Sequence, residues 1–162
     1  MKKRLLVKIA SLFLIFGLVT GCGNDDYEPE TNNQNGYEEG NGERELTVQE
    51  FFANNPDELQ DLIAMGQEET ETISETMGVE MTFDVEVVGP NSIAFIYIYG
   101  PSVEIHDEMG PALTTTLESL AAIHEMTAAG IRETIGVSTL YLIIRYVDND
   151  GNVLAEGTFA GQ

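Results

Sequence analysis

The apolar positions of this chain follow two spacings after residue 46, one typical of helices and one typical of strands. Helical spacing covers 47–77 and 102–129. Alternating or wholly apolar runs cover 79–99 and 137–160, and each is interrupted by a turn sequence of Gly, Pro, Asn or Asp, as hairpins are. The order predicts an α+β fold of two helix-hairpin (αββ) units, which form a four-stranded, mainly antiparallel sheet with packed helices.

The ends of the first helical region are marked by capping residues. Thr47 and Glu50 have the spacing of a capping box, and Asn55 followed by Pro56 restarts a helix that we expect to end at Gly78. This helix is predicted to present an apolar stripe to the core and acids to water. The stripe consists of Leu59, Leu62, Ile63, Ile73 and Met77, and the acids are Glu68, Glu69, Glu71 and Glu75.

The second helical region carries a stripe that ends before Gly130. Gly78-Val79 and Gly136-Val137 stand at matching places before the two hairpins, which suggests a weak internal duplication, although the strand alternation does not match between the halves. The stripe consists of Leu113, Leu117, Leu120, Ala121 and His124.

Two strands are apolar at every position, at 93–99 and 140–144, and we expect them to form the centre of the sheet. If the helices all cover one face, the other face would expose an aromatic stripe of Phe95, Tyr97 and Tyr99. Water does not tolerate a large bare patch of this kind. A partner, a second copy, a helix or the linker would then cover it.

The first 21 residues have the pattern of an export signal. Basic residues precede an apolar segment from Ile9 to Val19, and small residues follow it. The apolar run falls short of the roughly 20 residues that span a membrane, so we expect cleavage after Gly21 rather than retention. The basic residues are Lys2, Lys3, Arg4 and Lys8.

Val19-Thr20-Gly21-Cys22 resembles the lipobox of bacterial lipoproteins. The resemblance implies that the Cys22 thiol receives a diacylglyceryl group, becomes the new N-terminus and anchors the protein at the extracytoplasmic face of the cell membrane. Two acyl chains hold a protein stably at a bilayer, whereas one holds it marginally. Cys22 is the sole cysteine, so its modification leaves no thiol for a disulfide, a nucleophile or a metal.

All 28 acidic residues follow Cys22, against three arginines, which gives the predicted mature chain a formal charge of about −25. Such a charge repels nucleic acid and excludes it as a partner. Residues 22–45 are polar and acidic and are interpreted as a disordered linker behind the lipidated cysteine. Residues 46–162 are long enough for one globular domain.

Sequence motifs with chemical potential are weak here. His124-Glu125 lacks the second histidine of a zinc-protease helix, because position 128 is Ala128. The run His106-Asp107-Glu108 holds three adjacent ligand types, but it is better interpreted as a solvated helix start.

The segment from Asp148 to Asn152 resembles half of a calcium loop, but Phe159 stands where the bidentate glutamate belongs, and a hairpin turn explains the same residues. A weak calcium contact at this turn stays open. No catalytic, cofactor or metal residue is therefore predicted, and an enzyme is not expected.

Residues 46–159 resemble small lipoprotein domains of unassigned function that are common in Gram-positive bacteria. The resemblance rests on the helix-hairpin order, on Gly136-Val137 and on the hairpin from Tyr146 through Asp148 and Asp150-Gly151 to Phe159. The resemblance implies a location at the cell surface and an α+β fold, but it implies no activity. We expect a protein- or peptide-binding module; a self-associating envelope component, as a homodimer for example, is the alternative, and an enzyme with an unrecognised site comes third.

Overall fold

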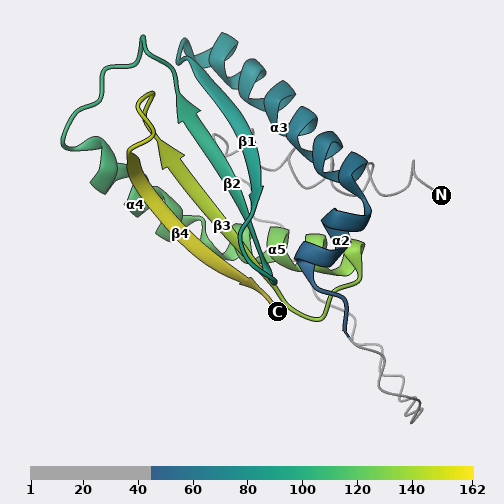
Figure 1. Cartoon of the computed structure of the whole chain (residues 1–162). Helices are drawn as coiled ribbons and strands as arrows, with labels where there is room; N and C mark the ends of the chain where they lie inside the picture. Colours follow the sequence, from purple (N-terminus) through teal and green to yellow (C-terminus); the bar gives the residue numbers. More distant parts are fainter. Residues whose placement is uncertain (1–44) are drawn as a thin grey trace, which may run out of the picture.

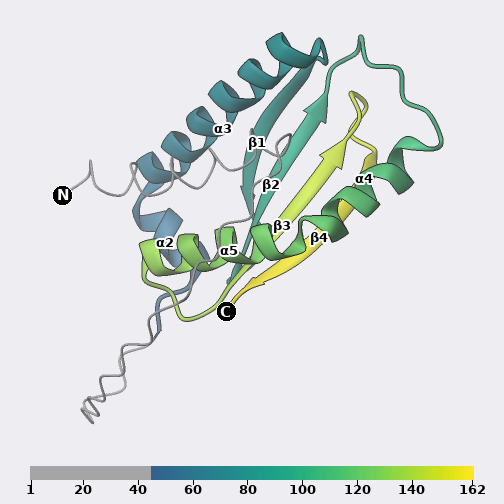
Figure 2. The ribbon, with the colours of Figure 1, turned by 180° about the vertical axis from the view of Figure 1, so that it is seen from behind.

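The computed structural model describes residues 45–162, which form one sheet with helices on one side (Figures 1 and 2). The sequence-based expectations about Gly21, Cys22 and the linker lie outside these residues, apart from the linker's last residue. The elements in chain order are α2 (Val48–Asn54), α3 (Pro56–Met77), β1 (Met81–Val87), β2 (Ser92–Tyr99), α4 (Met109–Ser119), α5 (Ala121–Ile135), β3 (Leu140–Val147) and β4 (Val153–Gly161).

The caps of α2 and α3 follow the predicted pattern with one difference. Thr47 Oγ1 accepts from the Glu50 amide, and the Glu50 carboxylate accepts from the Thr47 amide, as a capping box requires. Pro56 occupies the first position of α3. The Asn55 side chain does not cap α3; its Nδ2 instead donates to the Phe51 carbonyl at 2.8 Å and so closes the end of α2.

The end of α3 is also as predicted, since Gly78 adopts the left-handed conformation with φ 68°. One residue of the predicted apolar stripe is misplaced, because Met77 is 70% exposed in the last turn. Leu62 is buried, and Leu59 and Ile63 pack against the core.

The second helical region is two helices rather than one. The break lies at Leu120, whose backbone has φ −101° and ψ 10°, and it follows four hydroxyl side chains that donate to carbonyls three or four positions earlier. Gly130 lies inside α5 and does not end it; the helix ends at Gly136, whose φ of 73° suits glycine. The hydroxyls belong to Thr114, Thr115, Thr116 and Ser119.

The sheet has the order β1-β2-β3-β4. The two hairpins are antiparallel, and β2 and β3 pair in parallel at the centre. The prediction that the two wholly apolar strands form the central pair is therefore confirmed, as is the mainly antiparallel α+β class. Because β2 and β3 are parallel, β1 and β3 run in opposite directions, so the second αββ unit is not a copy of the first shifted along the sheet.

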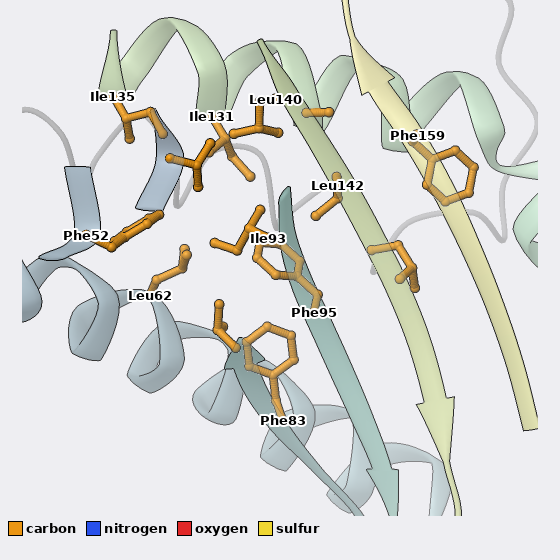
Figure 3. Close-up of a cluster of buried hydrophobic side chains, with 14 of the residues drawn as sticks. Phe52, Leu62, Phe83, Ile93, Phe95, Ile131, Ile135, Leu140, Leu142 and Phe159 are labelled. Carbon is orange, nitrogen blue, oxygen red and sulfur yellow. The ribbon is translucent and has the colours of Figure 1, made fainter. Parts of the chain in front are cut away.

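The core lies between the sheet and the helices (Figure 3). Gly66 of α3 lies directly against the Phe83 ring, so closely that a Cβ atom at Gly66 would fall 2.1 Å from it. At the opposite edge of the sheet, Leu117 of α4 approaches Gly157 of β4. The two helices therefore cover the same face, since Phe83 and Gly157 share it through the strand register.

The expectation that the aromatic stripe lies on the face opposite the helices is wrong, and the alternative that helices cover the stripe is correct. Phe95, Tyr97 and Tyr99 are all buried, and the register pairs Phe95 with Val85 and Tyr97 with Phe83, which place these aromatic residues on the helix-covered face. Both faces of β2 are apolar, so alternation alone could not assign a side. The face that the helices leave open carries the even-numbered residues of β2 instead.

Candidate interaction surface

The side of the sheet away from the helices, here called the open face, is covered by none of the four described helices (Figures 1 and 2). Figure 1 shows the strands in front of α4 and α5, and Figure 2 shows the same helices in front of the strands. The strand register shows which residues lie on the open face. One row across the sheet, from β1 to β4, consists of Asp84, Ile96, Arg145 and Glu156.

The middle of the open face is an apolar stripe that runs along β2 and β3. Ile96, Ile98 and Ile143 are half-buried, and Tyr141 is 42% exposed. Val153, which is paired with Val147 at the end of β4, is 54% exposed. Contiguous apolar surface of this kind marks interaction sites on soluble domains. We call the residues Ile96, Ile98, Tyr141 and Ile143 the central stripe; Ala94 and Val147 lie on the same face but are buried.

The two edge strands border the central stripe with polar residues. On β1 the side chains of Thr82, Asp84 and Glu86 are exposed, and on β4 those of Glu156 and Thr158 are exposed. The open face thus has apolar side chains along β2 and β3, interrupted by Arg145 on β3, with two acids on the β1 margin and Glu156 on the β4 margin.

Arg145 lies between the two acidic margins. Its Nε donates to Glu156 Oε2 at 2.6 Å, and its Nη1 lies 3.9 Å from Glu86 Oε2. The arginine side chain is 24% exposed and is the cation of the open face among the described residues. This arginine holds carboxylates from β1 and β4 together over the two strands between them.

The helix-covered face carries a cluster of three tyrosines, two of which belong to the aromatic stripe of β2. Tyr146 stacks on Tyr97 with ring centroids 5.2 Å apart and on Tyr99 at 6.3 Å. Burial raises the pKa of Tyr97, Tyr99 and Tyr146, the last to about 12. Burial also raises the pKa of Glu69 on α3 to about 7. The three phenols therefore stay protonated to a higher pH than a solvent-exposed tyrosine does.

The segment from Asp148 to Asn152 is a hairpin turn, as its residues favoured. The Asp148 carboxylate accepts from the backbone amides of Asp150 and Asn152 and from the Asn152 side chain at 2.8 to 2.9 Å. These bonds lower the pKa of Asp148. Gly151 has φ 84°, a left-handed conformation that glycine adopts without steric cost in such turns. Asp148 therefore closes the turn with its own oxygens.

The histidine candidates lie apart. His106 is exposed in the loop before α4 and lies 3.9 Å from Glu104, and it borders a shallow hollow with Ile105 and Met109. His124 is buried in α5 against Phe159, with ring centroids 4.6 Å apart, and burial lowers its pKa to about 4. Within residues 45–162 no three His, Cys, Asp or Glu side chains gather as metal ligands.

None of the described helices is both long enough and apolar enough to cross a membrane. Gly21 and Cys22, the predicted cleavage and lipidation residues, lie outside the described part of the chain, so their assignment rests on the sequence.

Comparisons with known proteins place the domain in a family but give it no activity. No curated protein matches the chain, and no solved structure matches it. A family model described as a domain of unknown function, DUF4854, matches residues 49–159, which take in every element from α3 to β3 and most of α2 and β4. The chain therefore belongs to the DUF4854 family, and the matched residues form its C-terminal domain of unknown function.

Proposed function

We propose that this protein is an exported, lipid-anchored cell-surface lipoprotein of a Gram-positive bacterium whose folded domain binds another protein or a peptide through the open face. The central stripe is the observation that carries the binding role, because it presents half-buried isoleucines and the exposed Tyr141 on a face that no described helix covers.

The membrane anchor is supported by the sequence around Cys22. A basic start, an apolar segment and Val19-Thr20-Gly21-Cys22 stand in the order of a lipoprotein signal. Lipidation would hold the domain at the outer side of the membrane without any spanning helix, since two acyl chains anchor a protein stably. The open face would then be available to other envelope or extracellular proteins.

The anchor is tested by mass spectrometry of the natural protein. We expect a chain that begins at Cys22 and carries a diacylglyceryl mass on its thiol. The variant Cys22→Ser should lose this mass and leave the membrane fraction or retain its leader. A natural protein with a bare thiol at Cys22 would remove the anchor from the proposal.

The binding role is tested by site-specific photo-crosslinking in intact cells. A photoreactive side chain in place of Ile143 should give a defined product with another protein, and the same group in place of Glu71, exposed on α3, should not. The added variant Ile96→Asp should abolish the product. Equal products from both positions would contradict a role for the open face, and a product with the mass of two copies would favour self-association instead.

A further inference from the structure

The two margins of the open face determine what kind of partner fits it. Asp84 and Glu86 are exposed on β1, and Glu156 is exposed on β4, against the single arginine Arg145. That arginine already contacts Glu86 and Glu156. The described residues of this face therefore carry excess negative charge next to apolar surface, and a partner that covers the stripe gains if it brings cations to the margins.

The spacing of the strands matches the width of a helix. Neighbouring strands lie about 4.8 Å apart, so the outer strands β1 and β4 are separated by roughly 14 Å. A helix with its side chains is about 10 to 12 Å across. A helix laid along β2 and β3 would rest its apolar side on Ile96, Ile143 and the stem of Arg145, and its flanking residues would lie above Glu86 and Glu156.

The charge of the open face also makes a second copy of the chain a poor partner. It would bring another set of carboxylates to the margins, and the whole chain has 28 acidic residues against seven basic ones. Like charges that face each other across an interface oppose association. The charge balance favours a different molecule over self-association.

We propose that the open face binds a basic amphipathic helix of another protein, with its apolar side on the central stripe and its lysines or arginines next to Asp84, Glu86 and Glu156. This inference rests on the proposed function and specifies the class of its partner. The partner helix would complete a second helical layer, opposite α3, α4 and α5.

The test uses the full-chain protein in nanodiscs of phosphatidylcholine, a lipid without net charge, with empty discs as background. The probe is a fluorescent model helix of about 18 residues, roughly 27 Å long, with a leucine stripe flanked by lysines. Its twin carries glutamate at every lysine position. We expect the lysine helix to bind at least tenfold more tightly than the glutamate helix, with an affinity that falls as salt is added.

Three variants separate the causes of binding. The pair Asp84→Asn with Glu86→Gln should weaken binding of the lysine helix roughly five- to tenfold, since exposed ion pairs contribute modestly. Ile143→Asp should abolish binding through the stripe. The control Glu71→Gln lies exposed on α3 and should change nothing.

The outcomes distinguish this inference from the proposed function. If Ile143→Asp abolishes binding but both model helices bind equally well, the open face binds partners and the requirement for a basic helix is wrong. If neither helix binds above the empty discs, the inference is also wrong, while the crosslinking test still decides the binding role. If Ile143→Asp leaves lysine-helix binding unchanged, the open face is not the site and both proposals fall.

Discussion

Arg145 on β3 and Glu156 on β4 are direct partners in the sheet register, and the Arg145 Nε donates to Glu156 Oε2 at 2.6 Å. Glu86 approaches the same guanidinium from β1 at 3.9 Å. The variant Arg145→Met keeps a long apolar stem but leaves two carboxylates without their cation. We expect a loss of about 1 kcal/mol in the free energy of unfolding, measured by urea denaturation at low salt.

Salt supplies the control for this prediction. Added salt screens the remaining carboxylates, so the difference between Arg145→Met and the wild-type protein should shrink as ionic strength rises. An Arg145→Met protein as stable as wild type at low salt would show that the ion pairs contribute nothing to folding.

The contact of Gly66 with Phe83 leaves no room for a methyl group. A Cβ at Gly66 would meet the Phe83 ring at 2.1 Å, and this ring is buried between α3 and the sheet. Gly66→Ala should therefore destabilise the domain by about 1 to 3 kcal/mol, although alanine favours helices by itself. The midpoint of urea unfolding measures this. The double variant Gly66→Ala with Phe83→Leu should lose less than the two single changes added together, and strict additivity would contradict the clash.

Glu69 should make the domain less stable as the pH rises through 7. Its pKa is raised by burial from 4.5 to about 7, so the folded state holds the proton more tightly than the unfolded state does. The stabilising contribution is complete below pH 4.5 and is lost as pH rises through 7. Glu69→Gln should be more stable than wild type above pH 7, by an amount on the order of 1 to 2 kcal/mol after solvent screening.

The measurement for Glu69 is the free energy of unfolding across a pH series. The difference between Glu69→Gln and wild type should vanish below pH 4.5. Glu68→Gln, one residue away on the exposed side of α3, is the matched control and should follow the wild-type profile. A constant difference for Glu69→Gln at every pH would contradict a titrating Glu69.

His124 should act in the opposite direction at acid pH. Burial lowers its pKa from 6.5 to about 4, so the unfolded state binds the proton more tightly between these values. Stability from this group is complete above pH 6.5, falls as pH drops toward 4 and is constant below that. His124→Leu keeps an apolar contact for Phe159, and its stability should decline less between pH 6.5 and 4 than that of wild type.

The exposed His106 gives the comparison for His124. His106→Leu should leave the acid decline of stability unchanged. If His124→Leu loses as much stability as wild type between pH 6.5 and 4, the acid decline comes from other groups, such as the many carboxylates of the chain.

Local signals predicted much of the fold because they depend on neighbouring residues. The capping box at Thr47 and the glycine at Gly78 were identified correctly, and the wholly apolar strands were correctly placed at the centre of the sheet. The break at Leu120 was missed, because the apolar spacing of Leu117, Leu120 and Ala121 continues across it.

The candidate surface could not be predicted from spacing, because it depends on pairing between distant strands. A strand that is apolar at every position does not reveal which side the helices cover, so Phe95 and Ile96 were indistinguishable until β1 fixed the register. The contacts of Arg145 with Glu86 and Glu156 likewise join three strands. The predicted lipid anchor at Cys22, by contrast, is a linear motif and needs no fold.

The parallel pairing of β2 with β3 also shapes how the chain must fold. Each hairpin forms from residues close in sequence, whereas Phe95 pairs with Ile144, 49 positions further along. The helices α4 and α5 fill that interval, so pairing β2 with β3 closes a longer loop than either hairpin does and costs more chain entropy. Until that loop closes, β2 and β3 are unpaired along one side, the state in which β-structures are most prone to join a neighbouring chain. Successful assembly of this domain therefore depends on its centre closing before another molecule reaches it.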